Sequence, residues 1–267
     1  MSGTNENKIR KAVRENYARV AETPKGASGC CCTPSCCSPS STSSAADTSV
    51  NMGYSQDEVE SVPEGSNMGL GCGNPQAIAS LKPGKTTVLD LGCGGGFDCF
   101  LAAKQVGNEG YVIGVDMTPE MVDKARKNVA ESKYDNVDIR LGEIENLPVA
   151  DNFVDVIISN CVINLSPDKQ RVFDEAFRVL KSGGRIAVSD VIASAPIPEN
   201  VRTDLALHAT CIAGASTSDE VIAMLQKAGF SDIRVAPKEE SKSFIKGWAP
   251  GSGAENYVVS ADIQAVK

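Results

Sequence analysis

Two sets of residues in this chain have types and spacings suited to chemistry: a glycine-rich stretch bordered by aspartates, and a group of cysteines. The glycine-rich stretch runs from Val88 to Phe97 and reads Val-Leu-Asp-Leu-Gly-Cys-Gly-Gly-Gly-Phe. Glycines permit the unusual dihedrals of a tight turn and let a ligand lie against bare backbone. The stretch opens into a helix predicted over Phe97–Val106, whose first N–H groups would point at the ligand. It therefore predicts a binding site for a small cofactor.

Two aspartates indicate which cofactor suits this loop. Asp90 precedes the first glycine, Gly92, by two residues, and Asp116 ends the next apolar run. A carboxylate at the loop opposes the pyrophosphate of a dinucleotide and suits a ligand that carries an amino group and a sulfonium. Asp116 is placed to accept hydrogen bonds from both ribose hydroxyls. These features favour S-adenosylmethionine over a dinucleotide, with a purely structural turn as the remaining interpretation of the glycines.

The cysteines indicate what such a cofactor would act on. Of the ten in the chain, Cys72 lies in a glycine-rich loop, Cys161 follows an apolar run, and Cys211 is near the end of a helical segment. Loops that follow the strands of one sheet converge on the same rim, so three thiols distant in sequence can meet there. Three thiolates bind a soft, thiophilic centre well and Mg²⁺ or Ca²⁺ poorly.

Each cysteine also has a plainer interpretation. A free cysteine often behaves as a small buried hydrophobe, and this is our expectation for Cys93 and Cys99. A structural zinc site is disfavoured because no Cys-x₂-Cys pair is matched by a second such pair. Five further cysteines crowd one polar segment, where a thiol reservoir, a redox site and simple disorder all remain open: Cys30, Cys31, Cys32, Cys36 and Cys37.

Alternating strands and helices must position these groups. Apolar runs predict strands over Thr87–Leu91, Tyr111–Asp116, Val137–Leu141, Val154–Ser159, Arg185–Asp190, Asp232–Ala236 and Asn256–Ala265. Such runs, alternating with helices, are typical of a parallel sheet covered on both faces. We expect an α/β fold with a Rossmann-like, doubly wound, mostly parallel seven-stranded sheet. Its ligands bind beyond the carboxyl ends of the strands, so Asp90, Asp116, Glu143 and Asn160 should line one crevice.

Capping signals and helical spacing predict the helices. They are expected over residues 8–21 (amphipathic), Phe97–Val106, Thr118 to about Glu131, Ser166 to the pair Gly183-Gly184, about Glu199–Ile212, and Thr217 to about Gly229. The first helix is expected to pack on the main domain or to cover a site. Gly26 to about Ser49 lacks large apolar residues and is predicted to be a flexible linker.

These elements divide the chain into three parts. Residues 1–65 hold the N-terminal helix and the Cys/Ser/Pro-rich segment, residues 66–195 the cofactor-binding core, and residues 196–267 the part that completes the sheet and the thiol site. The formal net charge of −8 and the lack of a basic stripe argue against nucleic acid as a partner. Neither a signal peptide nor a membrane span is recognised, so we expect a cytoplasmic protein with reduced thiols.

The chain resembles the class I S-adenosylmethionine-dependent methyltransferases over about residues 65–195. The resemblance rests on the motifs Val88–Gly96, Val112–Met117, Gly142–Pro148 and Val179–Gly184. It implies that Asp90, Gly92 and Gly94 face the methionine end of the cofactor and that Asp116 holds the ribose. By the same likeness Met117 packs on the adenine, and Glu143 and Ile144 flank its edge. An ordinary surface acid is the alternative interpretation of Glu143.

From about Tyr54 onward the chain resembles the arsenite methyltransferases. The similar motifs are Gly69–Asn74, Ser159–Lys169 and Cys211–Ala215. This resemblance implies arsenic detoxification, with Cys72, Cys161 and Cys211 as the ligands of trivalent arsenic. It also implies arsenite or its thiol conjugates as substrate and thioredoxin or glutathione as reductant. A further family cysteine lies upstream, where any member of the Cys30–Cys37 group can stand in.

Two rival functions follow from the same residues. A methyltransferase for a quinone or sterol ring would share the cofactor motifs but would not need three thiols. A non-catalytic, thiol-based metalloid-binding protein would need the thiols but not the cofactor crevice. The single histidine, His208, is expected on a helix face rather than in catalysis, because arsenic held by three sulfurs has no proton to lose.

Overall fold

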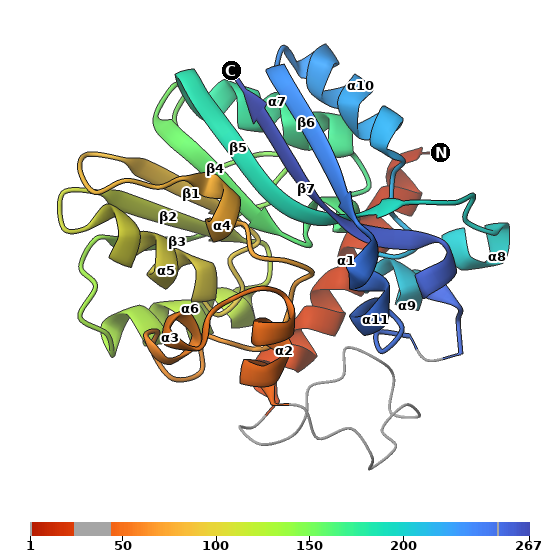
Figure 1. The fold of residues 1–267 in the computed structure, drawn as a ribbon, viewed down its shortest axis with the longest axis horizontal. Coiled ribbons are helices and arrows are strands. Elements are labelled where there is room, and N and C mark those ends of the chain that lie inside the picture. The colour runs from red at the N-terminus through yellow and green to blue at the C-terminus, as the bar shows by residue number, and fades with distance from the viewer. Residues whose placement is uncertain (1, 24–43, 250) are drawn as a thin grey trace.

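The computed structural model describes residues 2–23, 44–249 and 251–267, and their core is a seven-stranded sheet with helices on both faces (Figure 1). The strand order is β3-β2-β1-β4-β5-β7-β6. β1 to β5 pair in parallel, whereas β7 runs antiparallel to both β5 and β6. The strands are β1 (Thr87–Leu91), β2 (Tyr111–Asp116), β3 (Val137–Leu141), β4 (Val154–Asn160), β5 (Leu180–Ala193), β6 (Ser231–Lys238) and β7 (Val258–Val266). The predicted fold class is confirmed.

The helices cover the sheet in two layers because successive strand residues point to opposite faces. Leu89 packs in the cluster that holds Phe173 of α7 (Lys169–Val179), and its neighbour Val88 packs in the cluster that holds Phe100 of α5 (Phe97–Val106). The α-helices are α1 (Ser2–Glu22), α2 (Ala45–Asn51), α3 (Gln56–Glu60), α4 (Gln76–Ala79), α5 (Phe97–Val106), α6 (Pro119–Ala130), α7 (Lys169–Val179), α8 (Glu199–Arg202), α9 (Leu205–His208), α10 (Ser218–Ala228) and α11 (Lys242–Ile245). Three 3₁₀ turns complete the set: η1 (Ile163–Leu165), η2 (Glu239–Ser241) and η3 (Ala254–Asn256).

Three predicted segments differ in kind from the structure, while β5 and β7 differ from their predicted strands only in their bounds. Gly183 and Gly184 do not close a helix but lie inside β5, because α7 already ends at Val179 and both glycines pair through their backbone with Lys267. The helical segment predicted over 199–212 is two short helices, because Asp204 caps a new turn at α9. The predicted linker includes α2, which begins with a capping box between Ser44 and Asp47. The rest of that linker lies mostly within residues 24–43, outside the described residues.

The N-terminal helix α1 packs on the body of the molecule, as expected. It contacts α6, α9 and η1, and η1 directly follows β4; Figure 1 shows α1 close to the carboxyl end of β4. Lys124 Nζ donates to the carbonyl of Ala21 at 3.0 Å, which fixes the end of α1 to α6. None of the helices in the described part of the chain combines the length and the apolar character that a membrane crossing requires.

Candidate functional site

The glycine loop follows β1 directly and leads into α5. Gly92, Gly94 and Gly96 all have positive φ angles, of +69°, +50° and +91°. A side chain on Gly92 would collide with Val162, which lies over the loop. By contrast, a Cβ on Gly94 would meet nothing within 4 Å, so the middle of the loop borders open space. The loop therefore has the bare backbone that the sequence predicted.

The two aspartates border this loop. Asp116 receives the N–H groups of Gly94 at 3.0 Å and Thr118 at 2.9 Å, and burial raises its pKa. Asp90 is buried and accepts a hydrogen bond from the Cys99 thiol at 3.2 Å. Burial, and then the nearby charge of Asp98, raises the pKa of Asp90 well above its usual value. Carboxylates so poorly solvated favour a ligand with an ammonium group and hydroxyl donors, which is the chemistry of S-adenosylmethionine.

The other predicted cofactor residues lie at the same edge of the sheet. Met117 follows β2 and packs against the apolar cluster that holds Cys72, Cys161 and Cys211. Glu143 and Ile144 follow β3, and Ile144 is buried in the core. Glu143 is half-exposed and forms ion pairs with Arg14 at 3.2 Å and Arg10 at 3.8 Å, both on α1. Glu143 is therefore more than an ordinary surface acid, because its ion pairs connect α1 to this edge of the sheet.

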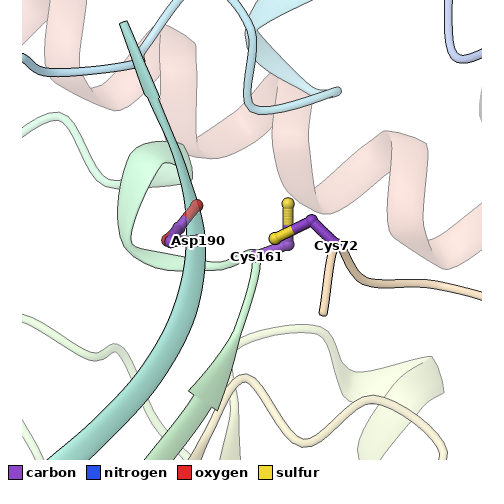
Figure 2. Close-up of side chains that lie close together, drawn as sticks. All are labelled: Cys72, Cys161 and Asp190. Carbon is purple, nitrogen blue, oxygen red and sulfur yellow. The ribbon is translucent and has the colours of Figure 1, made fainter. Parts of the chain in front are cut away.

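The structure buries all three predicted thiols in one apolar cluster, but the compact group of ligand atoms holds Cys72 and Cys161 with Asp190 and does not include Cys211. Cys72, Cys161 and Cys211 are buried in one cluster, which we call the thiol cluster. Figure 2 shows the side chains of Cys72 and Cys161 meeting from different segments, with Asp190 beside them. The two sulfurs and a carboxylate oxygen of Asp190 lie within 4.8 Å of one another. The Cys211 thiol donates to the carbonyl of Cys161 at 2.9 Å.

Two members of the thiol cluster have a strained backbone. Cys161 and Cys211 adopt φ angles of 58° and 64°, in the left-handed region that residues with a side chain seldom occupy. Such strain persists only where the surrounding structure enforces it, and it concentrates at functional sites. The backbone strain at Cys161 and Cys211 therefore supports a functional role for the thiol cluster.

The buried thiols hold their protons. Burial raises the pKa of Cys72 well above its ordinary value, and the neighbouring Cys161 adds to the effect. The pKa of Cys161 is also raised well above its ordinary value, first by the Cys211 side chain, while Cys72 acts in the opposite direction and burial adds to the rise. A centre that binds these sulfurs must therefore displace protons.

A hydrogen-bonded network holds the loop that carries Cys72. Asn160, at the end of β4, accepts the N–H of Cys72 at 2.9 Å and donates to the carbonyl of Gly73 at 2.8 Å. Its amide also donates to Tyr54 Oη at 3.0 Å, and Tyr54 donates to the buried carboxylate of Asp98 at 2.9 Å. The side chain of Asn160, predicted to touch the cofactor, is thus engaged by the thiol loop. The network connects the two halves of the site.

The Asp98 carboxyl makes this network sensitive to pH. Burial raises its pKa from 3.8 to about 6. A carboxyl with a raised folded-state pKa stabilises the fold below its unfolded-state pKa, and that stability is lost as the pH rises through the folded value. Relative to Asp98→Asn, wild type should therefore lose about 2 kcal/mol of unfolding free energy between pH 4 and pH 7. Urea denaturation across this range measures the difference, and a constant difference would contradict the assignment.

Asp190 is a member of the site that the sequence analysis did not single out. It accepts the N–H groups of Ile163 and Val191 at 2.9 and 2.8 Å, and the side-chain amide of Asn164 at 2.9 Å. Burial raises its pKa to about 6. Asp90 and Asp116 were identified as aspartates at or just before the end of a predicted strand. The same rule applies to Asp190, which ends the strand predicted over Arg185–Asp190, and would have found it.

The remaining chemical residues fall into three groups. Cys93 and Cys99 are buried beside the glycine loop, as expected of small hydrophobes. His208 is on α9, where its Nε2 lies 3.2 Å from the carbonyl oxygen of Leu165. The Cys30–Cys37 group lies outside the described residues.

Comparisons with known proteins agree with this geometry. The profile of the family described as "Methyltransferase domain" matches residues 82–229. An arsenite methyltransferase of Halobacterium salinarum is 51% identical over 269 residues, which is 97% of this chain and 66% of that protein. The human arsenite methyltransferase is 43% identical over 157 residues, which is 55% of this chain and 42% of the human protein. This chain therefore spans less than two thirds of the length of these relatives.

A solved structure gives the same result. The arsenic(III) S-adenosylmethionine methyltransferase of Chlamydomonas reinhardtii superposes with a TM-score of 0.62 at 32% identity, covering 85% of this chain and 75% of that one. The sheet order, the glycine loop and these similarities point to one family. The chain belongs to the methyltransferase domain family and, within it, to the arsenite methyltransferases.

Proposed function

We propose that the chain transfers a methyl group from S-adenosylmethionine to trivalent arsenic, as part of arsenic detoxification. The observation that carries this proposal is the meeting of Cys72, Cys161 and Cys211 at the edge of the sheet that also holds the glycine loop. Sulfur is the preferred ligand of a soft centre. A methyltransferase for a quinone or sterol ring would have no use for three converging thiols.

In the proposed complex the thiol cluster holds arsenic as a tris-thiolate. Each As–OH group of arsenite leaves as water with one thiol proton while an As–S bond forms, so the raised pKa values of Cys72 and Cys161 do not prevent binding. Arsenic bound in this way keeps its lone pair and has no proton to lose. The reaction therefore needs positioning rather than a general base, and aligned reactants gain effective molarities of roughly 10⁵–10⁸ M.

The strand ends would hold the cofactor. We propose that Asp90, Gly92 and Gly94 bind its methionine end and that Asp116 binds its ribose. Met117, Glu143 and Ile144 would surround the adenine, with Asn160 between the cofactor and the thiol loop. When bound, S-adenosylmethionine supplies a methyl group on a positively charged sulfur, which takes the electron pair of the broken bond. The thiol cluster would orient the arsenic lone pair toward the carbon of that methyl group.

The proposed reaction also sets requirements for the surroundings. Methylated arsenic carries one bond more and a positive charge, so its return to the trivalent state consumes two electrons and releases one of its sulfur ligands as a thiolate. Thiols of thioredoxin or glutathione are the proposed source of these electrons. The thiol cluster must itself stay reduced, which fits the cytoplasm as the compartment.

Incubation with arsenite, glutathione and methyl-labelled S-adenosylmethionine tests the proposal. We expect label in a methylated arsenic species, increasing with time and absent when arsenite is omitted. Bound arsenite without labelled product would instead identify a non-catalytic metalloid-binding protein. Label transferred only to an added quinone or sterol would favour the other rival.

A further inference from the structure

The carboxylate of Asp190 lies beside two of the sulfurs that the proposed reaction places on arsenic. Asp190 belongs to β5 and is only 1% exposed. One of its oxygens and the sulfurs of Cys72 and Cys161 lie within 4.8 Å of one another, and Figure 2 shows the three side chains together. An atom bonded to both sulfurs is therefore a neighbour of this carboxylate.

Asp190 forms no ion pair with any residue in the described part of the chain. Its hydrogen-bond donors are the N–H groups of Ile163 and Val191 and the side-chain amide of Asn164. Such donors favour the charged form of a carboxylate. Burial lowers the pKa of Lys169 and the charge of Asp190 raises it, so Lys169 lies within electrostatic range without contact. A buried charge without a paired cation is costly, which calls for a functional reason.

Methyl transfer to arsenic supplies such a reason, because the reaction moves one positive charge. The arsenic lone pair forms the As–C bond while the S–C bond of the cofactor breaks, and the sulfur keeps the electron pair of that bond. The positive charge thus leaves sulfur and develops on arsenic. Arsenic held by three thiolates is uncharged before the reaction. A fixed negative group beside it therefore stabilises the transition state more than the bound reactant.

We propose that the Asp190 carboxylate stabilises the positive charge that develops on arsenic, and that Asp190 is a catalytic residue of this chain. The inference rests on the proposed function, because it concerns methyl transfer at the thiol cluster. Asp190 is not an arsenic ligand in this proposal, since three sulfurs fill the bonds of trivalent arsenic and a carboxylate is a hard donor. It acts through its charge, whose effect is strong in a buried site.

Asp190 also has a structural role that an experiment must separate from this one. Its hydrogen bonds to Ile163 and Asn164 hold the segment that follows Cys161. Asn164 holds the same segment, because its amide donates to Asp190 at 2.9 Å and to the carbonyl of Val191 at 2.6 Å. Removal of the Asn164 side chain loosens this segment and leaves the charge of Asp190 in place. The two roles are therefore separable.

Replacement of Asp190 by asparagine removes the charge at constant size. In single turnovers of the full-length chain, with enzyme in saturating excess over arsenite, transfer of labelled methyl should slow about hundredfold, the usual effect of removing one fixed electrostatic contact. Arsenite affinity, followed by Trp248 fluorescence, should stay within about threefold of wild type because the sulfurs are unchanged. Asp190→Ser removes the charge without an amide N–H against Ile163 and should slow transfer equally.

Glu175→Gln is the matched control for loss of a buried carboxylate. Glu175 is buried and accepts the N–H of Leu147 at 2.8 Å, in a different part of the core. This variant should transfer the methyl group at the wild-type rate. A loss like that of Asp190→Asn would mean that any buried carboxylate matters to the fold, which overturns the proposal.

Two variants that keep the charge test whether Asp190 acts only by holding the segment after Cys161. Asn164→Ala should slow the transfer step less than about fivefold, the effect of one neutral hydrogen bond. Asp190→Glu should transfer at least about tenfold faster than Asp190→Asn, because it restores the negative charge. Equal slowing by Asp190→Asn and Asn164→Ala, or a glutamate variant no faster than the asparagine variant, would make Asp190 a positioning residue only and overturn the proposal.

These readouts distinguish failure of this inference from failure of the proposed function. If wild type transfers no methyl group to arsenic, the proposed function fails and the inference fails with it. If wild type transfers the group and the two charge-free variants of Asp190 do so at a similar rate, only the inference fails.

Discussion

Replacement of Cys161 by serine is expected to lower the rate of arsenite methylation at least about hundredfold, as expected for a reactant held out of place. Serine offers a hard oxygen where trivalent arsenic requires a soft sulfur, and two remaining thiols leave arsenic free to tilt. The loss should occur mainly in arsenite binding. The single tryptophan, Trp248, packs against the cluster that contains the thiols, so its fluorescence can follow arsenite binding directly.

The same variant should keep its affinity for S-adenosylmethionine, because Cys161 is not among the residues proposed to hold the cofactor. Cys99→Ser is the matched control, since it makes the same change at a buried cysteine outside the thiol cluster. It should retain arsenite binding by the fluorescence measurement. Arsenite binding and turnover by Cys161→Ser within a few-fold of wild type would remove Cys161 from the proposed ligand set.

The ends of β1, β2 and β3 were predictable from the sequence because strong local patterns determine them. The run Thr87–Leu91 and the helix Phe97–Val106 have the predicted bounds, since a continuous apolar run and a glycine cluster leave few alternatives. The parallel order then places Asp90 and Asp116 at one edge of the sheet. The fold class therefore followed from local pattern, and one topological rule supplies the proposed site of cofactor binding.

Contacts between distant segments were not predictable in the same way. Nothing local to Arg10 or Arg14 identifies Glu143 as their partner, because the pairing depends on how α1 crosses the sheet edge. The two hydrogen bonds between Asn160 and the Cys72 loop likewise join residues more than 80 positions apart. Gly183 and Gly184 misled the prediction because glycine pairs predict a break locally, whereas tertiary pairing with Lys267 extends the strand.

The described structure also indicates why both halves of the site should act together. Asn160 ends β4, directly before Cys161, and its side chain holds the loop of Cys72. Val162, the residue after Cys161, lies over Gly92 of the glycine loop. Three consecutive residues thus contact the thiol loop, the thiol cluster and the glycine loop in turn. A shift of this segment on arsenic binding would be transmitted to the cofactor loop through packed atoms.

Replacement of Asp116 by alanine is expected to weaken S-adenosylmethionine binding at least about hundredfold, because two charge-assisted hydrogen bonds to the ribose are lost at roughly 1.5–3 kcal/mol each. The N–H groups of Gly94 and Thr118 would lose their acceptor as well, which loosens the glycine loop. Arsenite binding, followed by Trp248 fluorescence, should remain because the thiol cluster is untouched. Calorimetry with S-adenosylhomocysteine measures cofactor-site affinity without turnover. Asp123→Ala, an exposed change on α6, is the matched control, and Asp116→Ala binding within threefold of that control would disprove the ribose assignment.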